Sequence, residues 1–373
     1  MKKQFQTGDF FAAFADGAIL FPLLATLTSL QGFSGSWLLL SAGIMYIISG
    51  WFFQVPMSVQ PLKSIAIAAI SVGASATEVR LSGGLLGLFC LCLTFYDVNT
   101  IAKKIPVSLI HGVQAALGVI LIFQGYKLGF NLYVIALVVL MMLVPSIKGL
   151  TVMGVAATLG VLWAVVFILK NNSIDNAIFP VSTTMTSAFL LQGSLRWGII
   201  GSLLLPQMAL TLANSVVGTA DVCHRYFPPA NKVTVRNLLT SIGLGNIISA
   251  LVGGLPFCHG AGGVTAHYKA GARHWSMNLV IGIFILTLAG ISFYQGQVII
   301  QFSPILLSAL LISTGLMHLK LALPTWNSSV EKFENRFQLI GMIIAVMLTR
   351  NILWALGCGA LIELFRLKKS SYQ

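Results

Sequence analysis

Long apolar stretches, each about the length of a membrane-spanning helix, follow one another along the chain and are separated by short segments with Gly, Pro, Asn, Lys or Arg. A helix that crosses ~30 Å of hydrocarbon needs about 20 residues. The pattern therefore predicts an all-α membrane protein with fourteen spans. They are expected near residues 8–29, 36–54, 57–76, 82–101, 106–126, 131–147, 150–170, 195–219, 236–252, 257–271, 277–293, 299–322, 337–349 and 351–367.

Composition supports the membrane interpretation and excludes a soluble protein. Hydrophobic residues make up 57% of the chain and charged residues 8%, whereas soluble domains contain about 25% charged residues. The net charge of +13 would suggest nucleic acid in a soluble protein, but here Lys and Arg concentrate in alternate loops. By the positive-inside rule this places both termini in the cytoplasm, most simply at a bacterial inner membrane.

The sequence does not favour an enzyme. It contains no GxxxxGK[ST] loop, no nucleophile–base pair that the pattern brings into one cavity, and no histidine spacing typical of a metal site. We therefore expect no cofactor, no metal and no nucleotide-binding domain.

The two halves of the chain resemble each other at an offset near 200 residues, which predicts repeats over 1–170 and 195–373 joined by a linker at 171–194. Seven spans per half would make the halves enter the membrane from opposite sides, as in an inverted repeat with its binding site at the midplane. The matched pairs are Pro56 with Pro256, Pro106 with Pro304, and Asp16 with Asn214.

The first candidate binding segment opens the interrupted third span. Pro56 and Pro61 favour an extended entry into a helix, and Gln60, Lys63 and Ser64 follow at its start. A helix N-terminus inside the membrane attracts anions, and a lysine within a span is a functional candidate. The alternatives for Lys63 are that it snorkels to the interface or forms a structural ion pair with Asp16.

The second candidate segment interrupts the tenth span at Pro256 and the glycines around it. A glycine-rich turn that leads into a helix can bind an anion through backbone N–H groups. Tight helix packing would explain one or two of these glycines but not the whole turn. The residues of this candidate turn are His259, Gly260, Ala261, Gly262 and Gly263.

A third set of polar residues lies in the eighth span. Gln207, Thr211 and Asn214 are spaced i, i+4 and i+7 and would share one face of an α-helix. Such a face points to a cavity or to another helix. Asp16, at the matching place in the first half, is a candidate for proton coupling or for pairing with Lys63.

Several segments resemble the molybdate transporters of the MOT type, a branch of the sulfate permease superfamily. They are VPMSVQPLKSIA (55–66), IPVSLIHGVQAALG (105–118), LPQMALTLANSVV (205–217) and GGLPFCHGAGGVTAHYKAGAR (253–273). The resemblance implies a seven-plus-seven inverted repeat in which a core domain slides against a gate domain, often in a homodimer. Short strands would lead into half-helices in the third and tenth spans. Gln60, Lys63, Ser64, Asn214 and the 259–263 turn would line the substrate site.

The chain departs from the family pattern in its first span, where Ala18 and Ile19 replace the family's glycine and threonine. The STAS domain of many sulfate permeases is absent from the sequence. Together, residues and resemblance predict a secondary transporter of a tetrahedral oxyanion, molybdate first and sulfate or a related anion second, coupled to protons, to sodium or to neither. A nucleobase permease and a non-transporting receptor or scaffold are the alternatives. Asn214 and Lys63 favour an anion over a nucleobase.

Overall fold

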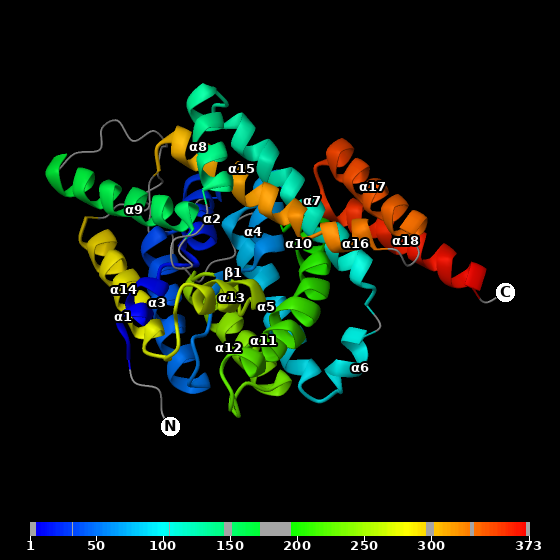
Figure 1. The fold of residues 1–373 in the computed structure, drawn as a ribbon, viewed down its shortest axis with the longest axis horizontal. Helices are drawn as coiled ribbons and strands as arrows, with labels where there is room; N and C mark the ends of the chain where they lie inside the picture. The colour runs from blue at the N-terminus through cyan, green and yellow to red at the C-terminus, as the bar shows by residue number, and fades with distance from the viewer. Residues whose placement is uncertain are drawn as a thin grey trace.

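The computed structural model describes residues 5–31, 33–103, 105–144, 151–171, 195–295, 302–328 and 332–370, and they are mostly helical (Figure 1). The elements of the first half are α1 (Thr7–Ala12), α2 (Gly17–Gln31), α3 (Gly35–Phe53), β1 (Gln60–Pro61), α4 (Lys63–Val72), α5 (Ala76–Leu93), α6 (Val98–Lys103), α7 (Val107–Lys127), α8 (Leu132–Leu143) and α9 (Val152–Asn171). Those of the second half are α10 (Trp197–Leu210), the π-helix η1 (Thr211–Gly218), α11 (Thr219–Tyr226), α12 (Val235–Val252), β2 (Phe257–Cys258), α13 (Ala261–Lys269), α14 (Met277–Gln295), α15 (Pro304–Lys320), α16 (Leu323–Asn327), α17 (Lys332–Thr349) and α18 (Ile352–Ser370).

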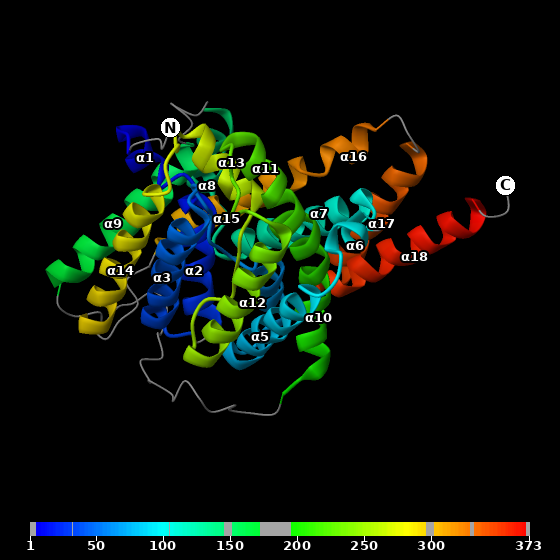
Figure 2. The same ribbon diagram turned by 90° about the horizontal axis from the view of Figure 1, so that it is seen from below.

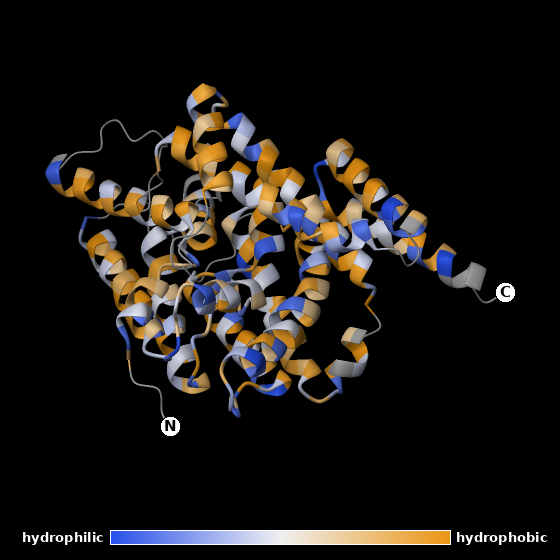
Figure 3. Ribbon diagram, in the orientation of Figure 1, coloured by the Kyte–Doolittle hydropathy of each residue, from blue (hydrophilic) through white to orange (hydrophobic). Residues whose placement is uncertain are grey.

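The chain is a multi-pass integral membrane protein. Within the described ranges, nine helical stretches are long and apolar enough to cross a membrane, and α4 and α8 are shorter apolar helices. Large apolar side chains such as Leu132, Leu348 and Phe365 are more than 70% exposed, and apolar residues run along the outer helices (Figure 3). Lipid is the environment that covers such a surface. The predicted linker at 171–194 lies outside the described residues except for Asn171.

Besides the interrupted third and tenth spans, and the fourth, which ends at Leu93 and resumes as α6 at Val98, the first and eighth predicted spans depart from a continuous α-helix. The first is broken by turns at Ala13–Asp16, between α1 and α2. The eighth extends to Tyr226 and changes to a π-helix at Thr211. Both departures place polar residues against the middle of the molecule, where β1 and β2 lie (Figure 1).

Three helix pairs form the framework, and each joins a helix of one half to a helix of the other: α3 with α14, α5 with α12, and α7 with α15 (Figures 1 and 2). Glycines meet at each crossing, and a Cβ on any of them would lie 2.6–3.0 Å from its partner's carbonyl oxygen. Glycine therefore permits backbones to approach this closely. The pairs are Gly43 with Gly282, Gly87 with Gly243, and Gly118 with Gly315.

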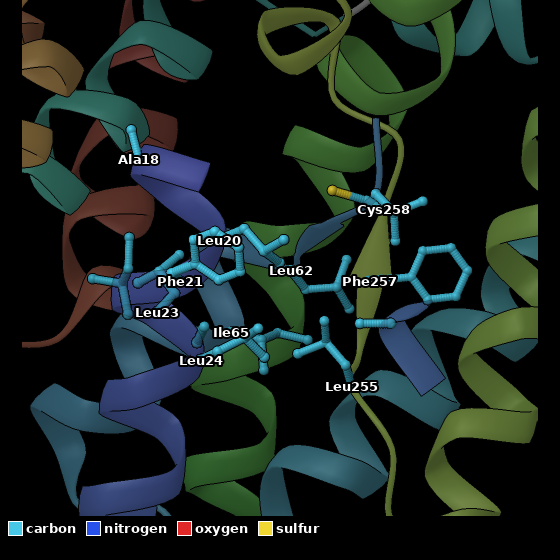
Figure 4. Packing of buried hydrophobic residues seen from close by; sticks show 14 of the residues in the cluster. Ala18, Leu20, Phe21, Leu23, Leu24, Leu62, Ile65, Leu255, Phe257 and Cys258 are labelled. Carbon is cyan, nitrogen blue, oxygen red and sulfur yellow. The ribbon is translucent and has the colours of Figure 1, made fainter. Parts of the chain in front are cut away.

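The interrupted third and tenth segments each contain a two-residue strand followed by a short helix, as the sequence predicts. Apolar packing fixes these units in the interior. In Figure 4, Leu20 and Leu24 of α2 face Leu62 and Ile65 at the start of α4. All four side chains are buried, so the start of α4 has a fixed position.

Candidate functional site

The two strand–helix units meet at the centre of the molecule. Strands β1 and β2 pair antiparallel, with Gln60 opposite Cys258 and Pro61 opposite Phe257. Helix α4 begins at Lys63 and α13 at Ala261, directly after the strands. Two helix N-termini, each with unpaired N–H groups and a positive dipole end, therefore begin close to the paired strands. This arrangement suits an anion.

Ser58 and His259 hold the two units together. The Ser58 hydroxyl donates to the carbonyl of Gly260 (2.8 Å) and accepts from the N–H of the same residue (3.0 Å). Nδ1 of His259 donates to the carbonyl of Ser58 (2.9 Å), and Nε2 is 2.9 Å from the hydroxyl of Ser241. Because the imidazole is fully buried and both nitrogens have protein partners, neither is left for a substrate.

Asp16 and Gln60 form a buried polar pair beside the start of α13. The Gln60 amide Nε2 donates to Asp16 Oδ1, whereas Asp16 Oδ2 and Gln60 Oε1 have no hydrogen-bond partner in the described part of the chain. A Cβ on Gly263 would lie 2.5 Å from Gln60 Nε2 and 2.8 Å from Asp16 Oδ2, and one on Gly260 would lie 2.5 Å from Gln60 Oε1. These glycines are thus needed for the pair to fit.

Lys63 is partly exposed at the first position of α4. It forms no ion pair with Asp16, although the two charges are close enough to influence each other. Among the described residues its ammonium has no hydrogen-bond or ion-pair partner. The next residue, Ser64, is fully buried, and its hydroxyl also lacks a partner. A cation and a hydroxyl are therefore available at this helix end.

The polar face predicted in the eighth span is divided by the π-helix. Gln207 Oε1 accepts the backbone N–H of Ser64 (2.9 Å), and its Nε2 donates to the hydroxyl of Thr211 (3.1 Å). Gln207 thus caps α4 and Thr211 orients Gln207. A π-helix has more residues per turn than an α-helix, so Asn214 no longer follows Thr211 in the α-helical register, and it is half-buried.

The sequence analysis missed two buried asparagines, Asn246 on α12 and Asn278 on α14. Each binds both the N–H and the carbonyl of one residue in or beside a strand: Asn246 binds Phe257, and Asn278 binds Met57. The available signal was an uncharged polar residue among the apolar residues of a spanning helix, which pattern analysis treats as a helix contact.

The residues at the start of α13 differ in exposure. Gly260 and Gly263 are buried, Ala261 is partly exposed, and Gly262 is exposed, with nothing within 4 Å of a Cβ placed on it. The start of α13 therefore has one face packed on Asp16 and Gln60 and another that is open. The described residues contain no group of three or more His, Cys, Asp or Glu side chains placed to hold a metal ion.

Comparison with solved structures shows the fold of anion transporters. The transmembrane domain of the cyanobacterial bicarbonate transporter BicA matches 95% of this chain and 97% of its own, with a TM-score of 0.64 and 15% identity. Murine Slc26a9, an anion transporter in the inward-facing state, matches 99% of this chain and 70% of its own, with a TM-score of 0.58 and 14% identity.

The chain belongs to the family described as "Molybdate transporter of MFS superfamily", whose model matches residues 9–121 and 200–317. Molybdate transporter 2 of Arabidopsis thaliana is 25% identical over 96% of this chain and 86% of its own length. Molybdate transporter 1 of the same organism is 26% identical over 74% of this chain and 71% of its own length. Its relatives are thus transporters and not enzymes.

Proposed function

We propose that this protein is a secondary active transporter of a tetrahedral oxyanion, with molybdate as the first candidate. The observation that carries the proposal is the pair of half-helix N-termini beside Lys63, whose ammonium has no partner among the residues that the structure describes. Molybdate is a dianion with acceptor oxygens on all sides, so backbone N–H groups, a hydroxyl and an ammonium complement it. The family and the names of the Arabidopsis relatives favour the same substrate.

The proposed ligands come from both half-helices. Lys63 and Ser64 would contact the anion from α4, together with the backbone N–H groups of Ala261, Gly262 and Gly263 from α13. Gly260 would shape the turn, because its own N–H donates to Ser58. Gln60 and Asn214 would complete the site. We assign His259 a positioning role instead of direct binding, because both its ring nitrogens are bonded within the protein. Gln207 and Thr211 support the start of α4.

Transport would follow alternating access, with a core that contains α4 and α13 moving as an elevator against a gate that contains α7, α15, α17 and α18. The proposed architecture has fourteen spans in two inverted repeats of seven. The three glycine-lined crossings support it, because exchanging the halves at an offset of 195–200 residues maps Gly43 on Gly243, Gly87 on Gly282, and Gly118 on Gly315. A homodimer in a bacterial inner membrane, with cytoplasmic termini, completes the proposal.

Sulfate or another anion is the alternative substrate, because the proposed ligands bind oxygen atoms and negative charge, which molybdate and sulfate share. A nucleobase fits less well, because the eighth predicted span (195–219) offers Gln207 and Asn214 but no carboxylate to its ring N–H groups, and Lys63 favours an anion. A receptor or scaffold would bind the anion without moving it. Asp16 is the candidate for coupling to a proton, and sodium is the other candidate ion.

Uptake of labelled molybdate into liposomes that contain the purified protein tests the function. Tungstate, sulfate and uracil serve as competitors, and empty liposomes as the blank. We expect saturable uptake that tungstate blocks and uracil does not. Uptake of sulfate but not molybdate would reassign the substrate, and binding without uptake would support the receptor.

A further inference from the structure

Strands β1 and β2 are too short to hold each other in place. They share two residue pairs, whereas even a longer isolated two-stranded hairpin is marginally stable. Yet these strands fix where α4 and α13 begin. Something outside the ladder must therefore determine how the two half-helices are placed.

Ser58 and His259 join the two units to each other, and two fully buried asparagines tie each unit to a long helix. Asn278 Oδ1 accepts the N–H of Met57 (3.0 Å), and its Nδ2 donates to the carbonyls of Met57 (2.7 Å) and Tyr46 (3.1 Å). Asn246 Oδ1 accepts the N–H of Phe257 (2.9 Å), and its Nδ2 donates to the carbonyls of Phe257 (2.7 Å) and Ile242 (2.8 Å). Each carboxamide thus ties one backbone residue to a long helix.

Glycines make room for both contacts. A Cβ on Gly50 of α3 would lie 2.4 Å from the Cβ of Asn278, and one on Gly245 of α12 would lie 2.4 Å from the ring of Phe257. Larger side chains at these places would push the tied segments away. The two contacts are therefore built into the packing of α3, α12 and α14.

The tied residues occupy matching places in the two halves. Met57 precedes Gln60 by three residues, and Phe257 precedes Gly260 by three residues. We infer that Asn246 and Asn278 are positioning residues that fix the separation of the two half-helix N-termini, and thereby the size of the oxyanion that fits between them. This inference rests on the proposed function.

A purely structural role would have a different signature. Loss of packing lowers stability and the amount of active protein, but it leaves unchanged the preference of each active molecule among substrates. Loss of a fixed separation widens the range of anions that fit. Because molybdate and sulfate have the same shape and charge and differ in size, the preference between them reports the separation.

The experiment measures molybdate uptake and its inhibition by sulfate for the wild type, Asn246→Ala and Asn278→Ala in liposomes, together with the melting temperature in detergent. Asn246→Ser and Asn278→Ser are made in parallel, because a hydroxyl keeps one hydrogen bond at lower risk to folding. Asn237→Ala is the matched control, since this asparagine is also on α12 but bonds only at its exposed start.

We expect the ratio of the sulfate inhibition constant to the molybdate KM to move about tenfold toward unity in the alanine variants, a change that corresponds to ~1.4 kcal/mol. The serine variants should fall between these and the wild type, and Asn237→Ala should keep the wild-type ratio. An unchanged ratio in folded variants, with only a lower Vmax or melting temperature, overturns the inference. If the alanine variants do not fold, the serine variants decide by the same criterion. A wild type that carries neither anion overturns the proposed function, and this inference with it.

Discussion

Lys63 is the residue on which the anion site most depends. Among the described residues its ammonium forms no ion pair, so replacement by alanine breaks no salt bridge and should leave the protein folded. We expect Lys63→Ala to lower the kcat/KM of molybdate uptake about 10- to 100-fold, the range that a hydrogen bond to a charged group supplies. Initial uptake rates at several molybdate concentrations measure it.

Lys320→Ala is the matched control, because Lys320 is an exposed cation at the end of α15. Its uptake should equal that of the wild type, which separates a local contact from a change in net charge. Wild-type kinetics in Lys63→Ala would exclude the lysine from the site.

Asp16 and Gln60 predict how transport depends on pH. When Asp16 is ionised, it accepts a hydrogen bond from the amide NH₂ of Gln60, and the amide oxygen of Gln60 has no donor among the described residues. An acceptor oxygen without a donor repels an anion beside it. A protonated Asp16 can instead donate to that oxygen, so the NH₂ is free to turn toward the anion. We therefore expect uptake to rise as pH falls in the wild type, and Asp16→Asn, which cannot ionise, to show no such rise.

Uptake at matched internal and external pH between 5.5 and 8, about the range in which buried carboxyls and histidines titrate, measures the slope. The other titratable groups around Asp16 are Lys63 on α4, Tyr46 on α3, Cys258 on β2, His267 on α13 and, near Lys63, His318 on α15. Asp221→Asn, at an exposed position, is the control. A slope that persists in Asp16→Asn would exclude Asp16 as the titrating group.

At the scale of elements, the start of α13 works only if it can approach Asp16 and Gln60. A methyl group on Gly263 would overlap Gln60, Ser58 and Asp16. We expect Gly263→Ala to destabilise the protein by about 1–3 kcal/mol, as overpacking does, and to lower molybdate uptake. Thermal unfolding in detergent and uptake together test it. Gly290→Ala on α14, where a Cβ meets nothing within 4 Å, should change neither.

The elements that the sequence predicted correctly are those that hydropathy and proline control. Pro56, Pro61 and Pro256 predicted the interruptions in the third and tenth segments, and apolar length predicted the long helices. The break at Ala13–Asp16 and the π-helix at Thr211–Gly218 could not be predicted, since both depend on tertiary contacts: Asp16 bonds to Gln60, and Thr219 bonds to the carbonyls of Asn214 and His259.

In the candidate site, too, local sequence predicted some features, and features that depend on tertiary contacts were missed. The family resemblance implied that Gln60 and the 259–263 turn share one site, and Gly260 and Gly263 do lie against Gln60. The hydrogen bond between Gln60 and Asp16 was not predicted, since Asp16 was a candidate for proton coupling or for pairing with Lys63. The role of His259 could not be read from the sequence, because its partner Ser241 lies on α12 and is brought close only by folding. Asn246 and Asn278 were missed for the same reason, as their partners are backbone groups far away in the chain or hidden in a strand.

At the scale of the whole molecule, the proposed elevator requires the core to slide past the gate. A hydrogen bond joins the two: the Ser71 hydroxyl, near the end of α4, donates to the carbonyl of Arg350 between α17 and α18. Arg350 has a φ of 56° and lies over the ring of Phe123 on α7, 3.4 Å from its centroid. This end of α4 is therefore seated on the proposed gate, and its release is required if α4 moves.

Cross-linking tests that movement. The background has its accessible thiols removed by Cys92→Ser and Cys358→Ser, since the other cysteines are buried. In this background we expect the double variant Ser71→Cys with Arg350→Cys to carry molybdate. A short cross-linker that attaches through disulfides should stop its uptake, and reduction should restore it. Each single-cysteine variant treated with the cross-linker is the control. It has no second thiol to link and should stay active. The cross-link joins α4 to the connection between α17 and α18. Full transport by the cross-linked double variant would therefore mean that these parts do not separate during the cycle. The elevator would then be replaced by a mechanism in which α4 stays fixed on the gate.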